Sequence, residues 1–485
     1  MAKSLSGNYI YALINTVTKF LFPLVTFPYV SRILFAEGIG LVNFYTSVIT
    51  YIVLITSIGI PSYAVRQIAR VKDDFDERNK QTTEIFLLHS ILTILGYVAV
   101  IVVAITVPRI HENLWLFLLI STNIFFVTIG CEWFYQGIED FRYITIRAIA
   151  VRVVSVVLLF VFVKDRSDIL YYGAYTVFGI IGGNLLNFFR LRKYISLSRI
   201  RFRELNPLIH FYPSIQIFGL SLIASIYLNL DIVMLGFMKD DASVGYYVGA
   251  EKLTKMLMEL ITALGVVLLP HLSSLVAHDN LDKFKEIVTK SVQYVTAVSI
   301  PMVTGVIFLA PLLINVFCGE SYQPSVLCLT ILAPIIFFIS VSYILSQAFY
   351  PLDMMRPLYI RAIVSAVVNF ALNLILIPLY AHDGAAIATF FAEFSSMIIS
   401  VYLFSKSVKV SLFHLKYFRY IIASLIMLMA LYSMSLLLHN DIIRIIILPI
   451  VGMIVYLSVL KIYGDGIIEL ALSKLMLFKS NRSFK

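Results

Sequence analysis

Long apolar blocks alternate with short polar segments along the whole chain. A helix of about 20 residues crosses the hydrocarbon of a bilayer, and each block has about that length. The blocks do not alternate apolar and polar residues at every second position, as the strands of a membrane barrel do. The pattern predicts an all-α integral membrane protein with about fourteen transmembrane helices, near residues 9–34, 40–61, 84–107, 114–136, 143–163, 168–190, 211–238, 243–268, 288–315, 325–349, 357–379, 384–405, 418–438 and 441–463.

The amino-acid composition is typical of a membrane protein. Of its 485 residues 60% are hydrophobic and 14% are charged, whereas soluble domains carry about 25% charged residues. The first block is too long for the core of a signal peptide and no small-residue cleavage site follows it, so we expect an uncleaved first span. Cys131, Cys318 and Cys328 have no metal-type spacing, and we expect them to be small buried hydrophobes.

The distribution of Lys and Arg predicts the orientation of the spans. With a cytoplasmic N-terminus, 28 basic residues fall in inside loops and 6 in outside loops. Cytoplasmic loops of membrane proteins carry such an excess. We therefore expect both termini in the cytoplasm. The net charge of +10 reflects this topology and contact with anionic lipids, and no basic domain outside the membrane could bind nucleic acid.

Part of the sequence occurs twice. YQGIEDFRYITIRAI at residues 135–149 matches FYPLDMMRPLYIRAI at residues 349–363, so that Arg147 aligns with Arg361. Weaker echoes pair Gly173 with Gly384 and Gly40 with Gly245. The matched stretches lie six predicted spans apart, an even number, so the two copies would point the same way through the membrane. Parallel repeats of this kind recur in transporters, with the substrate path between the halves.

The repeat suggests a division into four parts. We expect a six-helix bundle over residues 1–190, a basic cytoplasmic linker over 191–210 and a second six-helix bundle over 211–410. Two additional spans and a cytoplasmic tail would occupy residues 411–485.

Several ionisable residues fall inside predicted spans, where a charge costs several kcal/mol unless it faces protein or water. Glu251, Lys255 and Glu259 recur at every fourth position and share one helical face. Such a stripe could form a packed ion-pair network that joins the first, seventh and eighth spans, or it could line a water-filled cavity between the halves. We expect the cavity. The candidates near the middle of spans are Lys19, Arg152, Asp231, Glu251, Lys252, Lys255, Glu259 and Glu393.

The charges suggest two roles. Lys19, Arg152, Lys252 and Lys255 would give a cavity the positive charge needed to receive a phosphate-bearing substrate. The acidic candidates could pair with these bases, or bind a proton or Na⁺; they are Asp231, Glu251, Glu259 and Glu393. Asn369 and Asn373 share a helical face and either join helices or hydrogen-bond sugar hydroxyls.

Enzymatic function is not expected. The sequence contains no GxxxxGK[ST] phosphate loop and no HExxH or GxSxG motif. Segments outside the predicted spans are about 20 residues at most, too short for a catalytic domain. We therefore expect no catalytic residue, no metal and no cofactor.

Four stretches carry a family resemblance. These are FPLVTFPYVSRILFAEGIGLVNF, WFYQGIEDFRYI, NLDIVMLG and SVGYYVGAEKL. Together they resemble the Wzx-like bacterial polysaccharide-biosynthesis flippases of the multidrug/oligosaccharidyl-lipid/polysaccharide exporter superfamily, from about residue 5 to residue 460. The resemblance implies a V-shaped central cleft and movement of a polyprenyl-diphosphate-linked oligosaccharide to the outer leaflet of the bacterial inner membrane, for capsule or O-antigen assembly.

One departure from the family is visible, and other functions stay open. Relatives often read Leu-Gly-Pro-Glu where this chain reads Leu34-Phe35-Ala36-Glu37, which puts the turn between the first two spans in doubt. A cation-coupled exporter of small drugs and a non-catalytic scaffold in a glycan-assembly complex are the alternatives. Implied partners are the lipid-linked oligosaccharide, membrane lipids, a sugar polymerase and a chain-length regulator.

Overall fold

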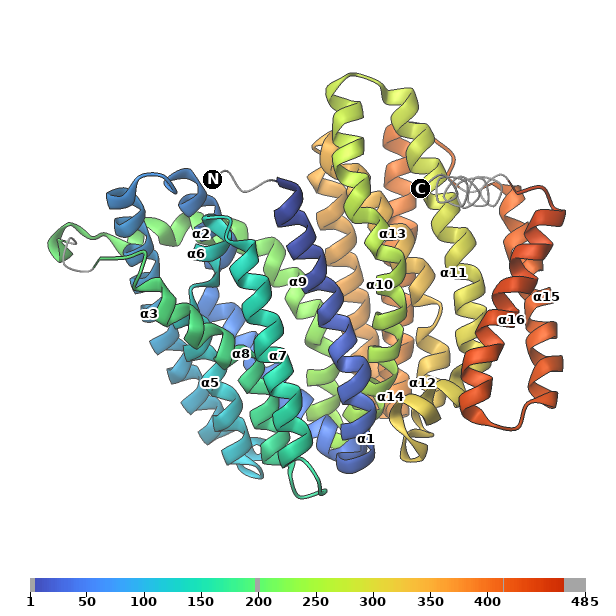
Figure 1. The fold of residues 1–485 in the computed structure, drawn as a ribbon, viewed down its shortest axis with the longest axis horizontal. Helices are drawn as coiled ribbons and strands as arrows, with labels where there is room; N and C mark the ends of the chain where they lie inside the picture. The colour runs from blue at the N-terminus through green and yellow to red at the C-terminus, as the bar shows by residue number, and fades with distance from the viewer. Residues whose placement is uncertain (1–4, 197–200, 413, 466–485) are drawn as a thin grey trace, which may run out of the picture. The chain divides into compact units, whose positions relative to one another are not determined.

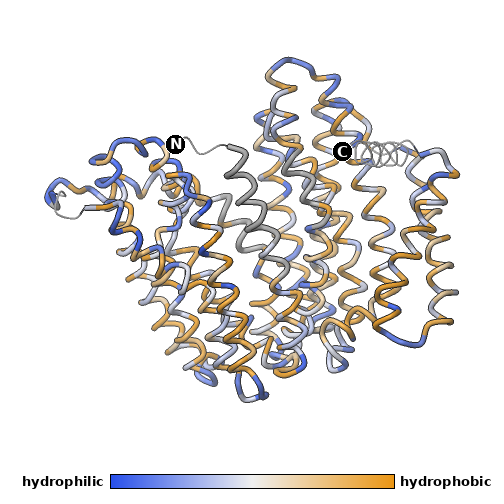
Figure 2. Tube along the Cα trace, viewed as in Figure 1, coloured by the Kyte–Doolittle hydropathy of each residue, from blue (hydrophilic) through white to orange (hydrophobic). Residues whose placement is uncertain are grey.

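The computed structural model describes residues 5–196, 201–412 and 414–465, and every regular element within these ranges is a helix (Figure 1). The fourteen predicted spans coincide with helices to within a few residues, except that 40–61, 114–136 and 325–349 each run across a break between two helices. The predicted fold class, an all-α membrane protein, is confirmed. Apolar residues run along the helices, and polar residues collect at their ends (Figure 2).

The chain forms two compact units, Met1–Gly245 and Tyr246–Lys485, which we call the N-terminal and C-terminal units. α9 belongs to the N-terminal unit because it packs against α1 and α2, so the division comes later in the chain than the predicted linker. The exact limits of the predicted bundles stay a prediction. The N-terminal unit contains α1 (Leu5–Ser57), α2 (Ile60–Arg70), α3 (Phe75–Thr106), α4 (Pro108–His111), α5 (Leu114–Gly130), α6 (Glu132–Gly137), α7 (Phe141–Phe162), α8 (Ile169–Leu191), α9 (Phe211–Met238) and the start of α10 (Asp241–Ala277).

The C-terminal unit is organised around one long helix. α11 packs against α12 and α13, which follow it directly in the sequence, and also against α15 and α16, which lie nearer the C-terminus. α13 in turn packs on α14. The helices of this unit are the rest of α10, α11 (Leu281–Cys318), α12 (Ser325–Leu332), α13 (Ile335–Phe349), α14 (Met355–Val408), α15 (Phe418–Leu437) and α16 (Asp441–Ile462).

Two helices are long enough to cross a bilayer twice. In the described part of the chain, ten helices are long and apolar enough to span a membrane. α14 has 54 residues, about 80 Å of helix, against a hydrocarbon thickness of about 30 Å. Its backbone leaves the helical conformation at Ala381, and that of α1 does so at Phe35. Each kink separates two of the predicted spans.

The kink in α1 places a bulky residue where the backbone favours glycine. Phe35 has φ 55° and ψ −176°, and a non-glycine residue in such a conformation costs about 1–3 kcal/mol. Its ring is partly exposed and carries the Arg166 guanidinium 5.3 Å from its centroid. This is the turn that the sequence put in doubt, and the structure retains it without the family's glycine.

We expect Phe35→Gly to be more stable than Phe35→Ala by about 1 kcal/mol, the reverse of the order in a helix interior. Both variants lose the ring and its contact with Arg166, but only glycine relieves the positive φ. Thermal unfolding of the two purified variants in the same detergent measures the difference. If Phe35→Ala is equal or more stable, the kink is not strained.

Two glycines allow the backbones of α1 and the start of α10 to come into contact. A Cβ added to Gly40 would lie 1.7 Å from the carbonyl oxygen of Asp241 and 2.7 Å from the backbone nitrogen of Gly245. A Cβ added to Gly245 would lie 1.9 Å from the carbonyl oxygen of Ala36. The backbones of α1 and α10 therefore touch at this point, and only glycine fits at either position.

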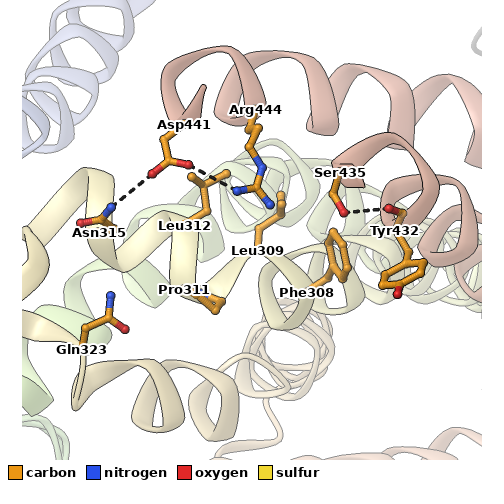
Figure 3. Close-up of a pocket in the computed structure, with 10 residues that line it drawn as sticks. All are labelled: Phe308, Leu309, Pro311, Leu312, Asn315, Gln323, Tyr432, Ser435, Asp441 and Arg444. Atoms are coloured by element: carbon orange, nitrogen blue, oxygen red, sulfur yellow. Dashed lines mark hydrogen bonds and ion pairs between the residues drawn. The ribbon is translucent and has the colours of Figure 1, made fainter. Parts of the chain in front are cut away.

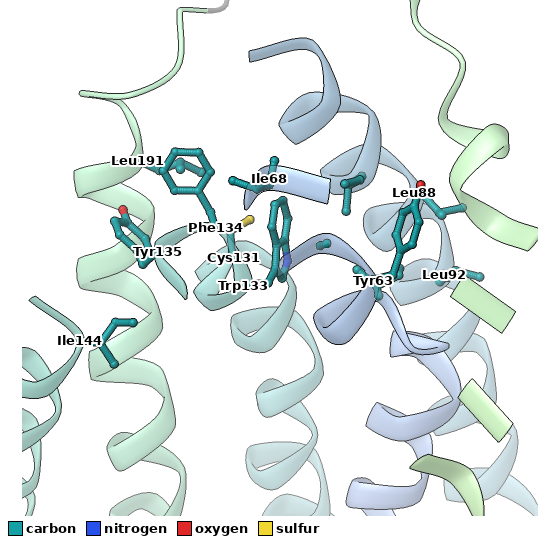
Figure 4. Packing of buried hydrophobic residues seen from close by; sticks show 13 residues of the cluster. Tyr63, Ile68, Leu88, Leu92, Cys131, Trp133, Phe134, Tyr135, Ile144 and Leu191 are labelled. Carbon is teal, nitrogen blue, oxygen red and sulfur yellow. The ribbon is translucent and has the colours of Figure 1, made fainter. Parts of the chain in front are cut away.

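A buried cluster consolidates one end of the N-terminal unit (Figure 4). Trp133, Phe134 and Tyr135 pack with Tyr63 and with aliphatic residues of α2, α3, α7 and α8. Cys131 lies in the same cluster, and Cys131, Cys318 and Cys328 are all buried free thiols. The interpretation of the cysteines as small hydrophobes is confirmed.

Beside this cluster a chain of hydrogen bonds holds the segment before α9 against α2 and α3. Nδ1 of His210 lies 2.7 Å from the Tyr63 hydroxyl, and its Nε2 lies 3.0 Å from Oε2 of Glu84. The amide of Gln67 donates to Tyr63, and the backbone N–H of Asn206 donates to Oε1 of Glu84. The side chains of Glu84 and His210 are 2% and 4% exposed. We call this buried network the linker latch.

Candidate functional site

A cavity of about 250 Å³ in the N-terminal unit contains one of the predicted site residues. It lies among α6, α7 and α8 and combines two cations with one carboxylate. We call it the arginine cavity. Its polar and glycine lining consists of Glu132, Arg147, Arg152, Gly179, Gly183 and Asn184.

Arg147 is the most buried charge of the arginine cavity. Its side chain is 6% exposed, and one terminal nitrogen, Nη2, lies 2.9 Å from Oε2 of Glu132. Within the described residues, Nε and Nη1 make no hydrogen bond. The guanidinium contacts the place where a Cβ would stand on Gly183, at 3.6–3.9 Å, so the glycine leaves room for it.

Arg152 lies deeper along the same helix. It is 11 residues after Phe141, the start of α7, or about 16 Å, whereas Arg147 is about 9 Å from that start. Nη1 of Arg152 donates to Oγ1 of Thr18 in α1 at 2.7 Å. Both arginines therefore lie within the predicted span at residues 143–163.

Local backbone geometry places the carboxylate. Cys131 has φ 42° and ends α5, so that α6 starts in a new direction with Glu132 as its first residue. The side chain of Glu132 is 44% exposed. Beneath it, a Cβ on Gly130 would lie 2.2 Å from Oδ1 of Asn184, so the close approach of α5 and α8 also needs glycine here.

The predicted charged stripe on α10 contains an ion pair. Nζ of Lys255 lies 2.6 Å from Oε1 of Glu251, with side-chain exposures of 45% and 17%. Lys252 and Glu259 are half-buried and have interaction partners of their own. Lys255 is the most exposed of these four residues.

The remaining predicted residues divide between the two units. Asp231 in α9 belongs to the N-terminal unit and Glu393 in α14 to the C-terminal unit; both are buried and have interaction partners. Lys19 lies in α1, but its side chain is outside the described residues. A common cleft that gathers these charges stays a prediction.

Asn369 and Asn373 are fully buried in the C-terminal unit. Nδ2 of Asn373 donates to Oδ1 of Asn369 at 3.1 Å, and Nδ2 of Asn369 donates to Oγ1 of Thr389 at 3.4 Å. The Tyr247 hydroxyl lies 3.2 Å from the same Thr389 oxygen. In this conformation the two asparagines join helix segments, which is one of the two roles that the sequence left open.

Two other cavities each contain an arginine–carboxylate ion pair. One of about 360 Å³ lies among α11, α15 and α16, where Arg444 and Asn315 both contact Asp441 at 3.3 Å (Figure 3). Another of about 590 Å³ in the N-terminal unit contains the exposed pair of Arg166 and Glu37. The arginines of these two cavities are more exposed than Arg147, since the side chain of Arg444 is 33% exposed and that of Arg166 is 64% exposed.

Sequence reasoning missed Glu132 and placed Arg147 among the cytoplasmic loop charges. The available signal was position, because Arg147 falls inside the predicted span at residues 143–163. The structure puts it two turns into α7, buried, with an acidic partner from another helix.

Comparisons with known proteins agree with this architecture. The family model described as polysaccharide biosynthesis protein matches residues 5–276. A protein of Escherichia coli (strain K12) named as an O-antigen transporter is 25% identical over 351 residues, covering 70% of this chain and 81% of that protein. A protein of the same name from Shigella dysenteriae is 26% identical over 397 residues, covering 81% and 96%.

Solved structures share the fold. The lipid II flippase MurJ in an inward closed conformation superposes with a TM-score of 0.72 at 18% identity, covering 94% of this chain and 98% of that one. An inward-facing multidrug resistance transporter of the MATE family gives 0.62 at 12% identity, covering 83% and 94%. All these relatives are named as transporters or flippases, in keeping with the prediction of a non-enzyme. Since the family model covers more than half of its length, the chain belongs to the polysaccharide biosynthesis protein family.

Proposed function

We propose that this membrane protein is a flippase that moves a polyprenyl-diphosphate-linked oligosaccharide from the cytoplasmic to the outer leaflet by alternating access. The membership of the polysaccharide biosynthesis family carries the proposal. The cations set within apolar helices support it physically, because an anionic group can cross hydrocarbon only with compensating charge.

Four basic residues would accompany the diphosphate. Lys19 and Arg152 belong to the N-terminal unit, and Lys252 and Lys255 to the C-terminal unit. Flexible, partly hydrated lysines attract phosphate as point charges without the tight bidentate grip of arginine. Release therefore stays possible while the barrier to crossing is lowered. The polyprenyl tail would remain in the lipid, and Asn369 and Asn373 would meet sugar hydroxyls in a conformation that opens their helix contact.

Acidic residues would couple transport to a cation gradient. Glu251 already neutralises Lys255, so a phosphate must compete with it. Protonation of Glu251, or Na⁺ bound near it, would release Lys255 for the substrate. Asp231, Glu259 and Glu393 are the other acidic groups within these helices that could take part.

We place the protein in the bacterial inner membrane with both termini in the cytoplasm, as the distribution of basic residues favours. It would supply a sugar polymerase and a chain-length regulator that build capsule or O-antigen. A cation-coupled drug exporter is the alternative that the shared MATE-like fold keeps in view. A scaffold without transport has no structural observation in its favour.

Lys252→Ala and Lys255→Ala should lower surface polysaccharide by about tenfold to hundredfold, as expected for loss of about 1.5–3 kcal/mol of charge-assisted contact with the diphosphate. The lysine-to-arginine variants should retain more activity. The measurement is surface glycan in cells that lack their own flippase, normalised to membrane protein level.

Lys290→Ala is the matched control, because Lys290 forms an ion pair with Glu286 at the same helical spacing on α11. It should export normally. Normal export by both α10 variants would contradict the cationic mechanism, and export of small cationic drugs instead of glycan would favour the alternative function.

A further inference from the structure

Arg147 has more hydrogen-bonding capacity than its surroundings use. A guanidinium presents five N–H donors, yet the described hydrogen bonds of Arg147 engage only Nη2, through Glu132. Burial of a charge is costly unless its hydrogen bonds are satisfied. Nε and Nη1 are buried and unbonded within the described residues. Arg147 therefore offers unbonded N–H donors at the wall of the arginine cavity.

The partner of Arg147 is unlike the partner of a structural ion pair. The Glu132 side chain is 44% exposed, while that of Arg147 is 6% exposed. A carboxylate that reaches in from a more polar position can withdraw with little cost, since water can take over its solvation. The buried cation stays in place.

The cavity has room for an anionic group. Its volume of about 250 Å³ corresponds to the liquid volume of about eight water molecules. Gly179 lines it without a side chain, and a Cβ there would meet only Oγ of Ser155, at 3.9 Å. Arg152 borders the same space from one turn deeper.

We propose that the arginine cavity is a diphosphate subsite in which Arg147 is the principal donor and Arg152 the second cation. Glu132 acts as a built-in competitor that a phosphate oxygen displaces from Arg147. This inference rests on the proposed function for the source of the diphosphate, the lipid carrier of the oligosaccharide. It assigns to the N-terminal unit a contact with substrate that uses Arg147 and Glu132, neither of which belongs to the four-cation set above.

Binding of inorganic diphosphate to the purified full-length protein tests the subsite. We expect Arg147→Gln to weaken binding at least tenfold and Glu132→Gln to tighten it severalfold, because the neutral amide no longer competes. Arg142→Gln is the matched control, since Arg142 lies on the same helix but is exposed and outside the cavity. Unchanged or weaker binding by Glu132→Gln would overturn the proposal.

A steric variant protects the test against misfolding of Arg147→Gln. Gly179→Val fills the cavity while both arginines keep their charge, and it should weaken binding at least tenfold. Gly305→Val, on a helix position with no atom within 4 Å of an added Cβ, should bind like the wild type. Normal binding by Gly179→Val would place the anion elsewhere and overturn the subsite.

Competition identifies the source of the anion. In lipid vesicles that contain the protein, polyprenyl diphosphate should displace inorganic diphosphate, and phosphatidylglycerol at equal concentration should not. Displacement by phosphatidylglycerol alone would assign the cavity to a bulk lipid headgroup and overturn the proposal.

Transport separates this inference from the proposed function. If Arg147→Gln and Gly179→Val cells export glycan normally while the wild type is active, the subsite is wrong and the flippase function stands. If the wild type exports no glycan although the cavity binds diphosphate, the proposed function fails by itself.

Discussion

Gly40→Ala should abolish the accumulation of folded protein in the membrane. The added methyl carbon would lie 1.7 Å from the Asp241 carbonyl oxygen, half of a normal van der Waals separation, and the obstacle is backbone that cannot rotate away. Overpacked cores lose about 1–3 kcal/mol, occasionally more, and this contact lies at or above that upper end. Detergent-solubilised protein measured by size exclusion and thermal unfolding provides the test.

The same substitution in another helix supplies the control. Gly305 in α11 has no atom within 4 Å of an added Cβ, and alanine in a helix interior is favoured over glycine by about 1 kcal/mol. Gly305→Ala should therefore raise the unfolding temperature slightly. Equal stability of Gly40→Ala and the wild type would mean that α1 and α10 do not touch at this point.

The contact at Gly40 also bears on the internal repeat. Gly40 meets Asp241 and Gly245, while Gly245 meets Ala36. Ala36 and Asp241 are separated by the same number of residues as Gly40 and Gly245. The pair of glycines that the sequence singled out as an echo thus meets face to face.

Helix positions were readable from the sequence because the bilayer sets one length for every span. The fourteen apolar blocks follow that length, and all are mainly helical, although three of them run across a break between two helices. The breaks at Phe35 and Ala381 fall between predicted spans, but hydropathy carries no information on backbone dihedral angles, so the sequence did not show that each break is a kink within one long helix. At Phe35 the usual marker, glycine, is replaced by a residue whose side chain gives no hint of a positive φ.

The site was readable only in part, for a related reason. A charge within a span identifies a residue that needs a partner, and Arg152 was found in this way. The identity of the partner depends on tertiary structure, so the contact of Arg147 with Glu132, 15 residues apart on different helices, was not predictable. Asn369 and Asn373 were recognised as a shared face, but their mutual hydrogen bond decides their role in this conformation.

Glu84→Ala should lower the free energy of unfolding by about 3–5 kcal/mol, the loss typical of a buried pair deprived of one partner. Glu84 accepts from both the His210 ring and the Asn206 backbone, so its removal leaves the buried His210 donor and the Asn206 N–H without their acceptor. His210→Ala should cost a similar amount, because it strands Glu84 and the Tyr63 hydroxyl. Denaturant unfolding in detergent measures both losses.

Proteolysis reports whether the linker latch is what fails. The segment before α9 contains Arg201 and Arg203, which are exposed, and the latch holds its end at Asn206 and His210. Both variants should be cut by trypsin in this segment several-fold faster than the wild type, at temperatures where the helices remain folded. Asp231 lies on α9, about 30 Å along the helix from His210. Release of the latch therefore also frees the start of the helix that carries Asp231.

The exposed pair of Lys72 and Glu139 provides the matched carboxylate control. Its members lie 3.2 Å apart with side-chain exposures of 38% and 51%, and exposed pairs contribute about 0–1 kcal/mol. Glu139→Ala should leave unfolding and proteolysis close to wild type. The two pairs differ mainly in burial. Equal losses of stability from Glu84→Ala and Glu139→Ala would therefore show that the latch contributes no more than a surface contact. In that case α9 is held in place by its apolar packing on α1 and α2 alone.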